Sequence, residues 1–568
     1  MRTARISSKS DQFEPDRFSA ILIIMILSEK SIGAGLPPRE YVIEEYVKTV
    51  CPDCFAERQR RSDEEDVWKD GMLVVHDGKV WMRRFCSEHG ETESLYEGDA
   101  EIWRARRGWN TSTLKVNPDR KDNYAGFPDG YRRGLPGSHG QHTCIVVLNI
   151  TERCNYACKA CYASALPPGT PEPTVERPTI DEIEKTVGTV IEREGGKLGV
   201  LMLSGGEPTV RSDIMELIES MSRFPITRIM LNTNGRRLVE DAEFLERIAI
   251  YRNKLEIYLQ FDGLRASTNR LLRNKDVTDE KLAAIRLLNE KRIFFTIVTT
   301  VARGVNEDEI GDIVRMGLDH PYCAGLALQP MFGSGRHPDY DPLNRTTPTG
   351  LLSAMKSSTN GLLSWEDFVP LPCSHRDCCD ITYLIRGESD EWKSLPSLIG
   401  REELKKWIGM ISNSITFDEL RTPLQEMLLS GTLTRVLSEQ QKLGTPQLMR
   451  DLAEICDCIP GLKEILGGAW SLACDIVKGR REMRESESPF EKMAERTFRI
   501  TIKQFMDANT FNDARLRQCC VHTGTFEDDP RRYSMCWRWL FKDASDFPDD
   551  ELQTIGARSV SSLAVEDS

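Results

Sequence analysis

The chain has 568 residues, more than one ordinary domain contains, and 40 % of them are hydrophobic, a normal globular balance. Its 75 Lys and Arg residues against 88 Asp and Glu residues give a net charge of −13, which argues against a nucleic-acid partner because such proteins usually present a basic face. Most of the 17 cysteines stand in tight groups, and the start of the chain does not have the pattern of a signal peptide. We therefore expect a cytoplasmic protein whose thiols bind metals.

The pattern of the chain changes at five points. In the first segment, the apolar run at 21–27 is too short to span a bilayer, which needs about 20 apolar residues, so it is either a buried element or a peripheral membrane contact. The expected regions are an N-terminal extension (1–39), a small rubredoxin-like or zinc-knuckle-like metal unit (40–108), a connector (109–143), a core (144–345), a C-terminal auxiliary iron–sulfur domain (346–545) and a mobile tail (546–568).

The core alternates apolar runs with amphipathic stripes. Ile180, Ile183 and Val187 lie on one helical face, and Thr179 with Glu182 predicts the capping box of that helix. Six strands joined by helices indicate an α/β fold with a parallel sheet and right-handed crossovers, an open (β/α)6 partial barrel because a closed one would need eight units. Its chemistry is expected at the carboxyl ends of the strands. The six runs are 144–150, 198–203, 228–231, 255–260, 294–301 and 325–329.

Three cysteines follow directly after the first predicted strand. Cys154, Cys158 and Cys161 are close enough in sequence for their thiolates to converge on one metal centre. Four-iron clusters are held by cysteine thiolates, and three protein ligands would leave one iron open for a cofactor or substrate. A structural zinc knuckle is the alternative, but zinc would require a fourth ligand nearby.

This C-x3-C-x2-C spacing after a strand resembles that of the radical S-adenosylmethionine (radical SAM) superfamily, over residues 144–345. The resemblance implies a 4Fe–4S cluster on the three cysteines, SAM bound to its open iron, and reductive cleavage of SAM to a 5′-deoxyadenosyl radical. That radical would abstract hydrogen from an unactivated C–H bond. One departure is Ala160, where the family often has an aromatic residue; here Tyr162 follows the third cysteine instead.

Polar motifs end the later predicted strands. The segment 204–208 (SGGEP) resembles the GGEP motif that contacts the SAM amino group, and its glycines permit close backbone approach. The two asparagines after the third strand and the aspartate after the fourth stand where family members line the SAM pocket, with ordinary turn chemistry as the alternative. The segment 329–336 is expected to close the pocket, unless Arg336 is a surface residue. The predicted cofactor-binding residues are Ser204, Gly205, Gly206, Glu207, Pro208, Asn232, Asn234, Gln260 and Asp262.

Two ligand pairs stand in the small N-terminal unit. Cys51 and Cys54 form one pair, and Cys86 and His89 form the other, with a predicted strand pair between them. Pairs on two turns suit a tetrahedral knuckle for Zn or Fe, whose fourth ligand is either His89 or Cys144. Buried reduced thiols are the alternative.

The C-terminal region is expected to be mostly helical, and its late cysteines predict one or more auxiliary 4Fe–4S clusters. One cysteine of each adjacent pair is a candidate bystander, and Cys144 and Cys323 are most simply core residues. For Cys456, Cys458 and Cys474 the expected state is a buried thiol. The predicted auxiliary ligands are Cys373, Cys378, Cys379, Cys519, Cys520 and Cys536.

The order of these motifs, from Cys51 to Cys536, resembles the archaeal tetraether lipid synthase family and its bacterial relatives. The resemblance implies auxiliary clusters, a rubredoxin-like iron and radical C–C coupling of lipid chains; related members have been assigned to pterin methylation. The family often has a further cysteine-rich stretch before the core, and most of those thiols are absent from residues 127–144.

Three functions follow from these patterns. The first is radical coupling of lipid chains, with a reducing electron donor protein and peripheral membrane contact. The second is modification of a pterin-type cofactor precursor or a peptide by the same radical chemistry. The third, a non-catalytic iron–sulfur electron carrier, is disfavoured by the segment 204–208, because a carrier has no need to bind SAM.

Overall fold

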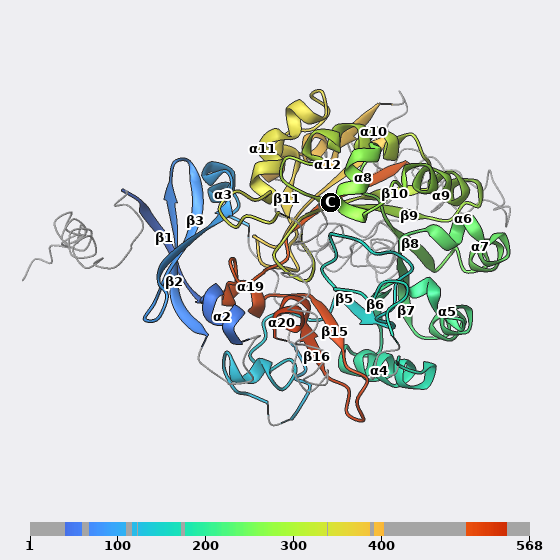
Figure 1. Cartoon of the computed structure of the whole chain (residues 1–568), viewed down its shortest axis with the longest axis horizontal. Coiled ribbons are helices and arrows are strands. Elements are labelled where there is room, and N and C mark those ends of the chain that lie inside the picture. Colours follow the sequence, from blue (N-terminus) through green and yellow to red (C-terminus); the bar gives the residue numbers. More distant parts are fainter. Residues whose placement is uncertain are drawn as a thin grey trace, which may run out of the picture.

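The computed structural model describes residues 40–58, 67–109, 116–121, 123–171, 177–337, 339–386, 391–402 and 496–541. The predicted extension and tail, with Cys456, Cys458 and Cys474, lie outside these residues. The described strands form two sheets, one of four strands and one of 12 strands (Figure 1). Within the described part of the chain, no helix combines the length and the apolar character needed to cross a membrane.

The small sheet is built from residues near the N-terminus, and it is drawn in blue in Figure 1. Its four strands are antiparallel neighbours in chain order, and a helix follows the first strand and another the last. The turn after the first strand and the turn between the last two lie at the same end of the sheet, which brings the two predicted ligand pairs together. The elements are β1 (Val42–Val50), α2 (Pro52–Arg58), β2 (Trp68–His76), β3 (Lys79–Cys86), β4 (Gly90–Glu97) and α3 (Ala100–Ala105).

The core of the large sheet confirms the six predicted parallel strands, which are neighbours in chain order. They are β5 (Ile145–Asn149), β6 (Leu198–Ser204), β7 (Ile226–Thr233), β8 (Leu255–Gln260), β9 (Phe295–Val301) and β10 (Cys323–Pro330). Helices lie along the outer side of this sheet in Figure 1. They are α4 (Ile180–Arg193), α5 (Ile214–Ser222), α6 (Arg236–Glu240), α7 (Ala242–Ala249), α8 (Ala266–Arg273), α9 (Thr278–Glu290) and α10 (Ile310–Leu318).

Local signals explain why these elements form where they do. The predicted capping box of α4 is present, with Thr179 and Glu182 each bonding the other's backbone. The apolar stripe of α4, including Ile183 and Val187, is fully buried in the core between the sheet and the helices. A second apolar cluster fills the inside of the curved sheet, with Val147, Met202 and other inward-facing strand residues.

The C-terminal region extends both edges of this sheet. At one edge β14 (Thr497–Lys503) pairs parallel with β10, and β12 (Cys379–Arg386) pairs antiparallel with β14. At the other edge β15 (Val521–Gly524) pairs parallel with β5. The expectation of a mostly helical C-terminal region is therefore wrong for its described residues. The physical reason is that the open six-stranded sheet leaves two unpaired edges, and β-branched runs such as Thr497–Lys503 satisfy them.

The remaining elements are short. The C-terminal strands are β11 (Val369–Pro370), β12 (Cys379–Arg386), β13 (Trp392–Ser394), β14 (Thr497–Lys503), β15 (Val521–Gly524) and β16 (Arg532–Ser534). The accompanying helices are α11 (Pro348–Ser358), α12 (Leu395–Ile399), α19 (Asp513–Arg517) and α20 (Met535–Leu540). Single 3-10 turns are η1 (Asp129–Tyr131), η2 (Pro208–Val210), η3 (Glu307–Glu309) and η4 (Trp365–Asp367).

Candidate active site and metal centres

A pocket lies at the carboxyl ends of the core strands, as the parallel sheet predicts. Its empty volume is about 970 Å³, part of it open to solvent. The three cysteines of the triplet line it together with Gly205, Gly206, Glu207, Asn232, Asn234 and Gln260. Ser204, Pro208 and Asp262 are buried beside the pocket and do not line it.

The thiols of Cys154, Cys158 and Cys161 line the same pocket. Burial, Glu207 and the two other thiols raise the pKa of Cys154 well above its usual range. The sulfur atoms are not all within 4.8 Å of one another, in contrast to those of the groups around Cys51 and around Cys144. A four-iron cube holds its cysteine sulfurs farther apart than a single ion does, so these residues fit a 4Fe–4S cluster.

The glycines after β6 allow the cysteine loop to approach. Gly205 has a φ of +121°, and a Cβ there would stand 2.2 Å from the carbonyl oxygen of Thr151. A Cβ on Gly206 would stand 2.2 Å from the carbonyl oxygen of Arg153. The Gly206 amide donates to Thr151 at 2.7 Å, which fixes this loop against the start of the cysteine segment. Only glycine permits this approach.

Glu207 holds the ends of two strands together. Its Oε1 accepts from Thr209 N at 3.0 Å, Thr209 Oγ1 at 2.6 Å and Thr233 Oγ1 at 2.7 Å. Its Oε2 accepts from Asn234 N at 2.7 Å. The carboxylate is 99 % buried, so most of its accepting capacity serves the protein backbone and the neighbouring hydroxyls. Glu207 therefore shapes the pocket wall besides facing it.

Amide side chains form a connected layer across neighbouring strands. Asn232 Nδ2 donates to Ser204 Oγ at 2.8 Å, and Gln260 Nε2 donates to Asn232 Oδ1 at 2.8 Å. Asn234 Nδ2 donates to Asn155 Oδ1 in the cysteine loop at 2.7 Å. The predicted polar strand ends are thus brought together at one face of the pocket.

Two cations of the pocket have no signal in the sequence pattern. Arg273, the last residue of α8, forms a bidentate ion pair with Asp262, and its Nη1 lies 3.9 Å from Cys158 Sγ. Lys281 is buried and donates to the carbonyl of Asn234, and burial lowers its pKa to about 8. Both positions are set by how α8 and α9 return to the sheet, so only the fold reveals them.

Arg336 is a structural partner of the cysteine loop and not a plain surface residue. Its Nε donates to the carbonyl of Cys158 at 3.0 Å, and its Nη1 donates to the carbonyl of Ala165 at 3.0 Å. Its backbone forms a two-bond bridge with Cys161. Gly335 beside it has a φ of +64°, and a Cβ there would stand 2.3 Å from the Cys161 carbonyl oxygen. The segment after β10 therefore fixes the cysteine loop.

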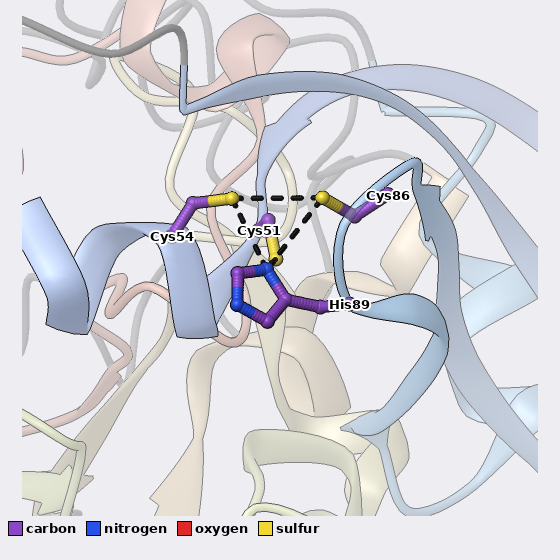
Figure 2. Close-up of side chains that lie close together, drawn as sticks. All are labelled: Cys51, Cys54, Cys86 and His89. Atoms are coloured by element: carbon purple, nitrogen blue, oxygen red, sulfur yellow. Dashed lines mark hydrogen bonds between the residues drawn. The ribbon is translucent and has the colours of Figure 1, made fainter.

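The knuckle ligands converge at the end of the small sheet, and Figure 2 shows the four side chains pointing toward one another. Cys54 Sγ lies 3.5 Å from Cys86 Sγ and 3.3 Å from His89 Nδ1. Cys51 Sγ lies 3.7 Å from the same nitrogen, which makes His89 and not Cys144 the fourth member. His89 Nε2 lies 3.2 Å from Glu57, the outer partner that fixes a metal-binding imidazole. Three thiolates and one imidazole suit tetrahedral zinc or iron.

The late cysteines divide into two groups, and Cys144 joins one of them. The sulfurs of Cys144, Cys373 and Cys520 all lie within 4.8 Å of one another. Cys144 is buried in the apolar core, as expected, and it also meets the other two sulfurs because its strand starts beside the segment that carries Cys520. Cys323 is buried, and its thiol donates to the carbonyl of Gly325, as expected of a core thiol.

The remaining late cysteines, Cys378, Cys519 and Cys536, affect one another's pKa, but their sulfurs are not all within 4.8 Å of one another. Burial, with the nearby Cys520 and Cys378 thiols, raises the pKa of Cys519 to about 12. Burial and the nearby Cys519 likewise raise the pKa of Cys536 to about 12. Arg515, which is 99 % buried, donates through Nε to Cys378 Sγ at 3.4 Å. The Cys379 thiol instead donates to the carbonyl of Asp380 at 3.6 Å.

The comparisons with known proteins agree with this architecture. The family model of the radical SAM superfamily matches residues 148–317, and the model described as the HMPTM N-terminal zinc ribbon domain matches residues 43–98. The protein is a radical SAM enzyme, which depends on a 4Fe–4S cluster and SAM, and it carries a zinc ribbon and further cysteine groups.

Two relatives and one solved structure show what the chain is similar to. The chain is 26 % identical over 471 residues to the 7,8-dihydro-6-hydroxymethylpterin dimethyltransferase of Methanocaldococcus jannaschii, covering 80 % of this chain and 88 % of the relative. It is 29 % identical over 247 residues to the GTP 3′,8-cyclase of Rhodopseudomonas palustris, covering 41 % of this chain and 68 % of that relative. The crystal structure of Streptococcus suis SuiB bound to S-adenosylmethionine aligns with 39 % of this chain and 47 % of its own, at 14 % identity and a TM-score of 0.31.

Proposed function

We propose that this radical SAM enzyme modifies a small heterocyclic substrate of the pterin type, at a carbon atom, inside the pocket described above. The observation that carries the proposal is that three amide side chains, Asn232, Gln260 and Gln329, line the pocket. Amides offer both donors and acceptors, which match the lactam and amino edges of a pterin ring. The pterin dimethyltransferase similar to this chain over 88 % of the relative's length supports the same substrate class.

In this proposal the chain's own residues divide into two sets. Cys154, Cys158 and Cys161 hold the cluster, and the loop of Gly205 and Gly206 lies where SAM would contact the backbone. When bound, the cluster and SAM supply a 5′-deoxyadenosyl radical that abstracts hydrogen from carbon. A protein or chemical reductant must deliver the electron for each cleavage.

The second set positions the substrate. Gln329 lines the pocket, and its Nε2 donates to the Tyr258 hydroxyl at 3.3 Å. Met331 and Phe332, which follow β10, supply an apolar wall against which a flat ring can stack. A pocket with few placed polar groups and an apolar wall is typical of small-molecule sites.

Coupling of lipid chains, the alternative taken from the tetraether synthase resemblance, stays a prediction. The relatives reported above are named for pterin and GTP substrates. A lipid chain beside Asn232 and Gln260 would leave the remaining hydrogen-bonding capacity of their amides unused, because hydrocarbon offers no donor or acceptor. Peripheral membrane contact is not required by the pterin proposal.

Anaerobic assays with the full chain, SAM and dithionite test the proposal. Three substrates are compared: 7,8-dihydro-6-hydroxymethylpterin, GTP and a dialkyl glycerol ether in detergent micelles. Mass spectrometry follows 5′-deoxyadenosine and each substrate. We expect 5′-deoxyadenosine together with a pterin product of altered mass, formed by the wild type and not by Cys158→Ala.

A variant of one of these three amides, Gln329, separates pterin binding from the reaction with SAM. Gln329→Leu removes a hydrogen-bonding group of about 1–3 kcal/mol, so the KM for pterin should rise about tenfold to a hundredfold while SAM binding is unchanged. Conversion of GTP or the lipid, with the pterin mass unaltered, would overturn the proposal.

A further inference from the structure

Three sulfur atoms meet inside the large sheet, away from the triplet of the SAM pocket. Cys520 Sγ lies 3.7 Å from Cys373 Sγ, and Cys144 Sγ lies within 4.8 Å of both. All three cysteines are at least 96 % buried. We infer that Cys144, Cys373 and Cys520 hold a single tetrahedral metal ion, zinc or iron, and that His142 moves toward them to supply the fourth ligand.

The sulfur separations favour one ion over a cluster. A metal–sulfur bond of about 2.3 Å in a tetrahedral site places two sulfurs about 3.8 Å apart. The 3.7 Å between Cys520 and Cys373 matches this value, as does the 3.5 Å between Cys54 and Cys86 in the zinc ribbon. The cysteines of the SAM pocket do not reach such a spacing as a group. The Cys144 group therefore resembles the ribbon site and not the cluster site.

His142 is the candidate for the fourth ligand, although its ring nitrogen does not lie within 4.8 Å of all three sulfurs and must approach Cys373 and Cys520 to complete the site. Its Nε2 lies 3.4 Å from Cys144 Sγ, the range expected between two ligands of one ion. Its Nδ1 lies 2.9 Å from Oε1 of the fully buried Gln141, which holds the proton on Nδ1 and leaves the Nε2 lone pair for a metal. His89 of the ribbon has the mirror arrangement, with Nε2 held by Glu57 and Nδ1 facing the sulfurs.

The ion would join the two edges of the curved sheet. Cys144 and Cys520 precede the adjacent parallel strands β5 and β15, and the Cys144 amide donates to the Cys520 carbonyl at 2.9 Å. Cys373 comes from the loop between β11 and β12, at the opposite end of the strand order. Three segments distant in sequence thus meet at one point. The site acts as a structural clasp, and Cys378, Cys519 and Cys536 remain available for an auxiliary cluster.

Cobalt substitution in the full chain tests the inference without an activity assay. Tetrahedral cobalt bound by thiolates gives intense visible bands that can be titrated. We expect two such ions in the wild type and one in the Cys51→Ala/Cys54→Ala double variant, which lacks the ribbon ligands. Adding Cys520→Ala to that background should remove the remaining ion, whereas adding Cys323→Ala, a matched buried thiol, should leave it.

Two further measurements keep the result interpretable. Adding His142→Ala to the ribbon-less background should weaken cobalt binding at least tenfold, because an imidazole ligand is lost. Iron and acid-labile sulfide of the Cys520→Ala protein should equal those of the wild-type clusters. A single tetrahedral ion in the wild type would overturn the inference even if a variant fails to fold. Loss of a whole cluster's iron and sulfide with Cys520→Ala would also overturn it, because the site would then hold a cluster.

Discussion

Replacing Glu207 by glutamine tests how the loop after β6 is held. The glutamine carbonyl can take the place of Oε1 and keep the bonds from Thr209 and Thr233. Its NH2 group then faces the Asn234 amide, which donates to Oε2 at 2.7 Å in the wild type. A bond to a charged acceptor contributes about 1.5–3 kcal/mol, and a stranded buried N–H costs about 1–3 kcal/mol. Together these contributions predict that the free energy of opening this hydrogen bond falls by about 3 kcal/mol.

Amide hydrogen exchange measures this loss at the residue concerned. A loss of about 3 kcal/mol corresponds to about 150-fold faster exchange of the Asn234 amide, at about 1.36 kcal/mol per factor of ten. We also expect weaker SAM binding, because the same loop lines the pocket. Glu182→Gln is the matched control, since glutamine serves equally well in the capping box of α4. Unchanged protection of Asn234 in Glu207→Gln would refute the role assigned to this carboxylate.

Gly335→Ala should abolish cluster incorporation, because its Cβ would clash with the Cys161 carbonyl, and visible absorption should be lost. Gly304 has a similar φ of +71° but no atoms near its Cβ position, so Gly304→Ala should retain the cluster. Burial lowers the pKa of Lys281 to about 8, so the unfolded chain binds more protons above that pH and stability should rise toward pH 10. Lys281→Met should remove about 3 kcal/mol of that rise in thermal unfolding. His89→Ala should release the ribbon metal, measured by elemental analysis, while SAM binding persists.

The six-stranded core was predictable from the sequence because its signals are local. Each core strand is an apolar run, and each crossover carries an amphipathic stripe such as that of α4. The cysteine triplet and the ribbon pairs were equally accessible, since their ligands stand a few residues apart. The two edge extensions were not predicted, because β14 and β15 acquire their role only through partners far away in the chain.

The allocation of the late cysteines shows the same limit. Cys519 and Cys520 are adjacent, and in an extended chain consecutive side chains point to opposite sides. One therefore joins Cys378 and Cys536, and the other joins the Cys144 group. The only local signal noted for the Cys144 group is a histidine two residues before Cys144, and such a pattern is too common to predict a ligand by itself.

The zinc ribbon is docked against the loop that carries two of these late cysteines. Arg106, fully buried at the end of α3, donates to Glu97 of the ribbon at 2.8 Å and to Asp380 of β12. Trp103 Nε1 donates to Asp377 at 3.1 Å, and the Tyr96 hydroxyl donates to the same carboxylate at 3.0 Å.

Asp377 lies between Cys373 and Cys379, so these bonds order the loop between β11 and β12 from the ribbon side. Burial opposes ionisation of Asp377, yet His375 and Arg106 hold its pKa below the usual range. Removing one partner of a buried ion pair costs about 3–5 kcal/mol, so the docked arrangement is stiff. The ribbon can therefore fix the geometry of Cys373 and Cys378 without contributing a ligand to either group.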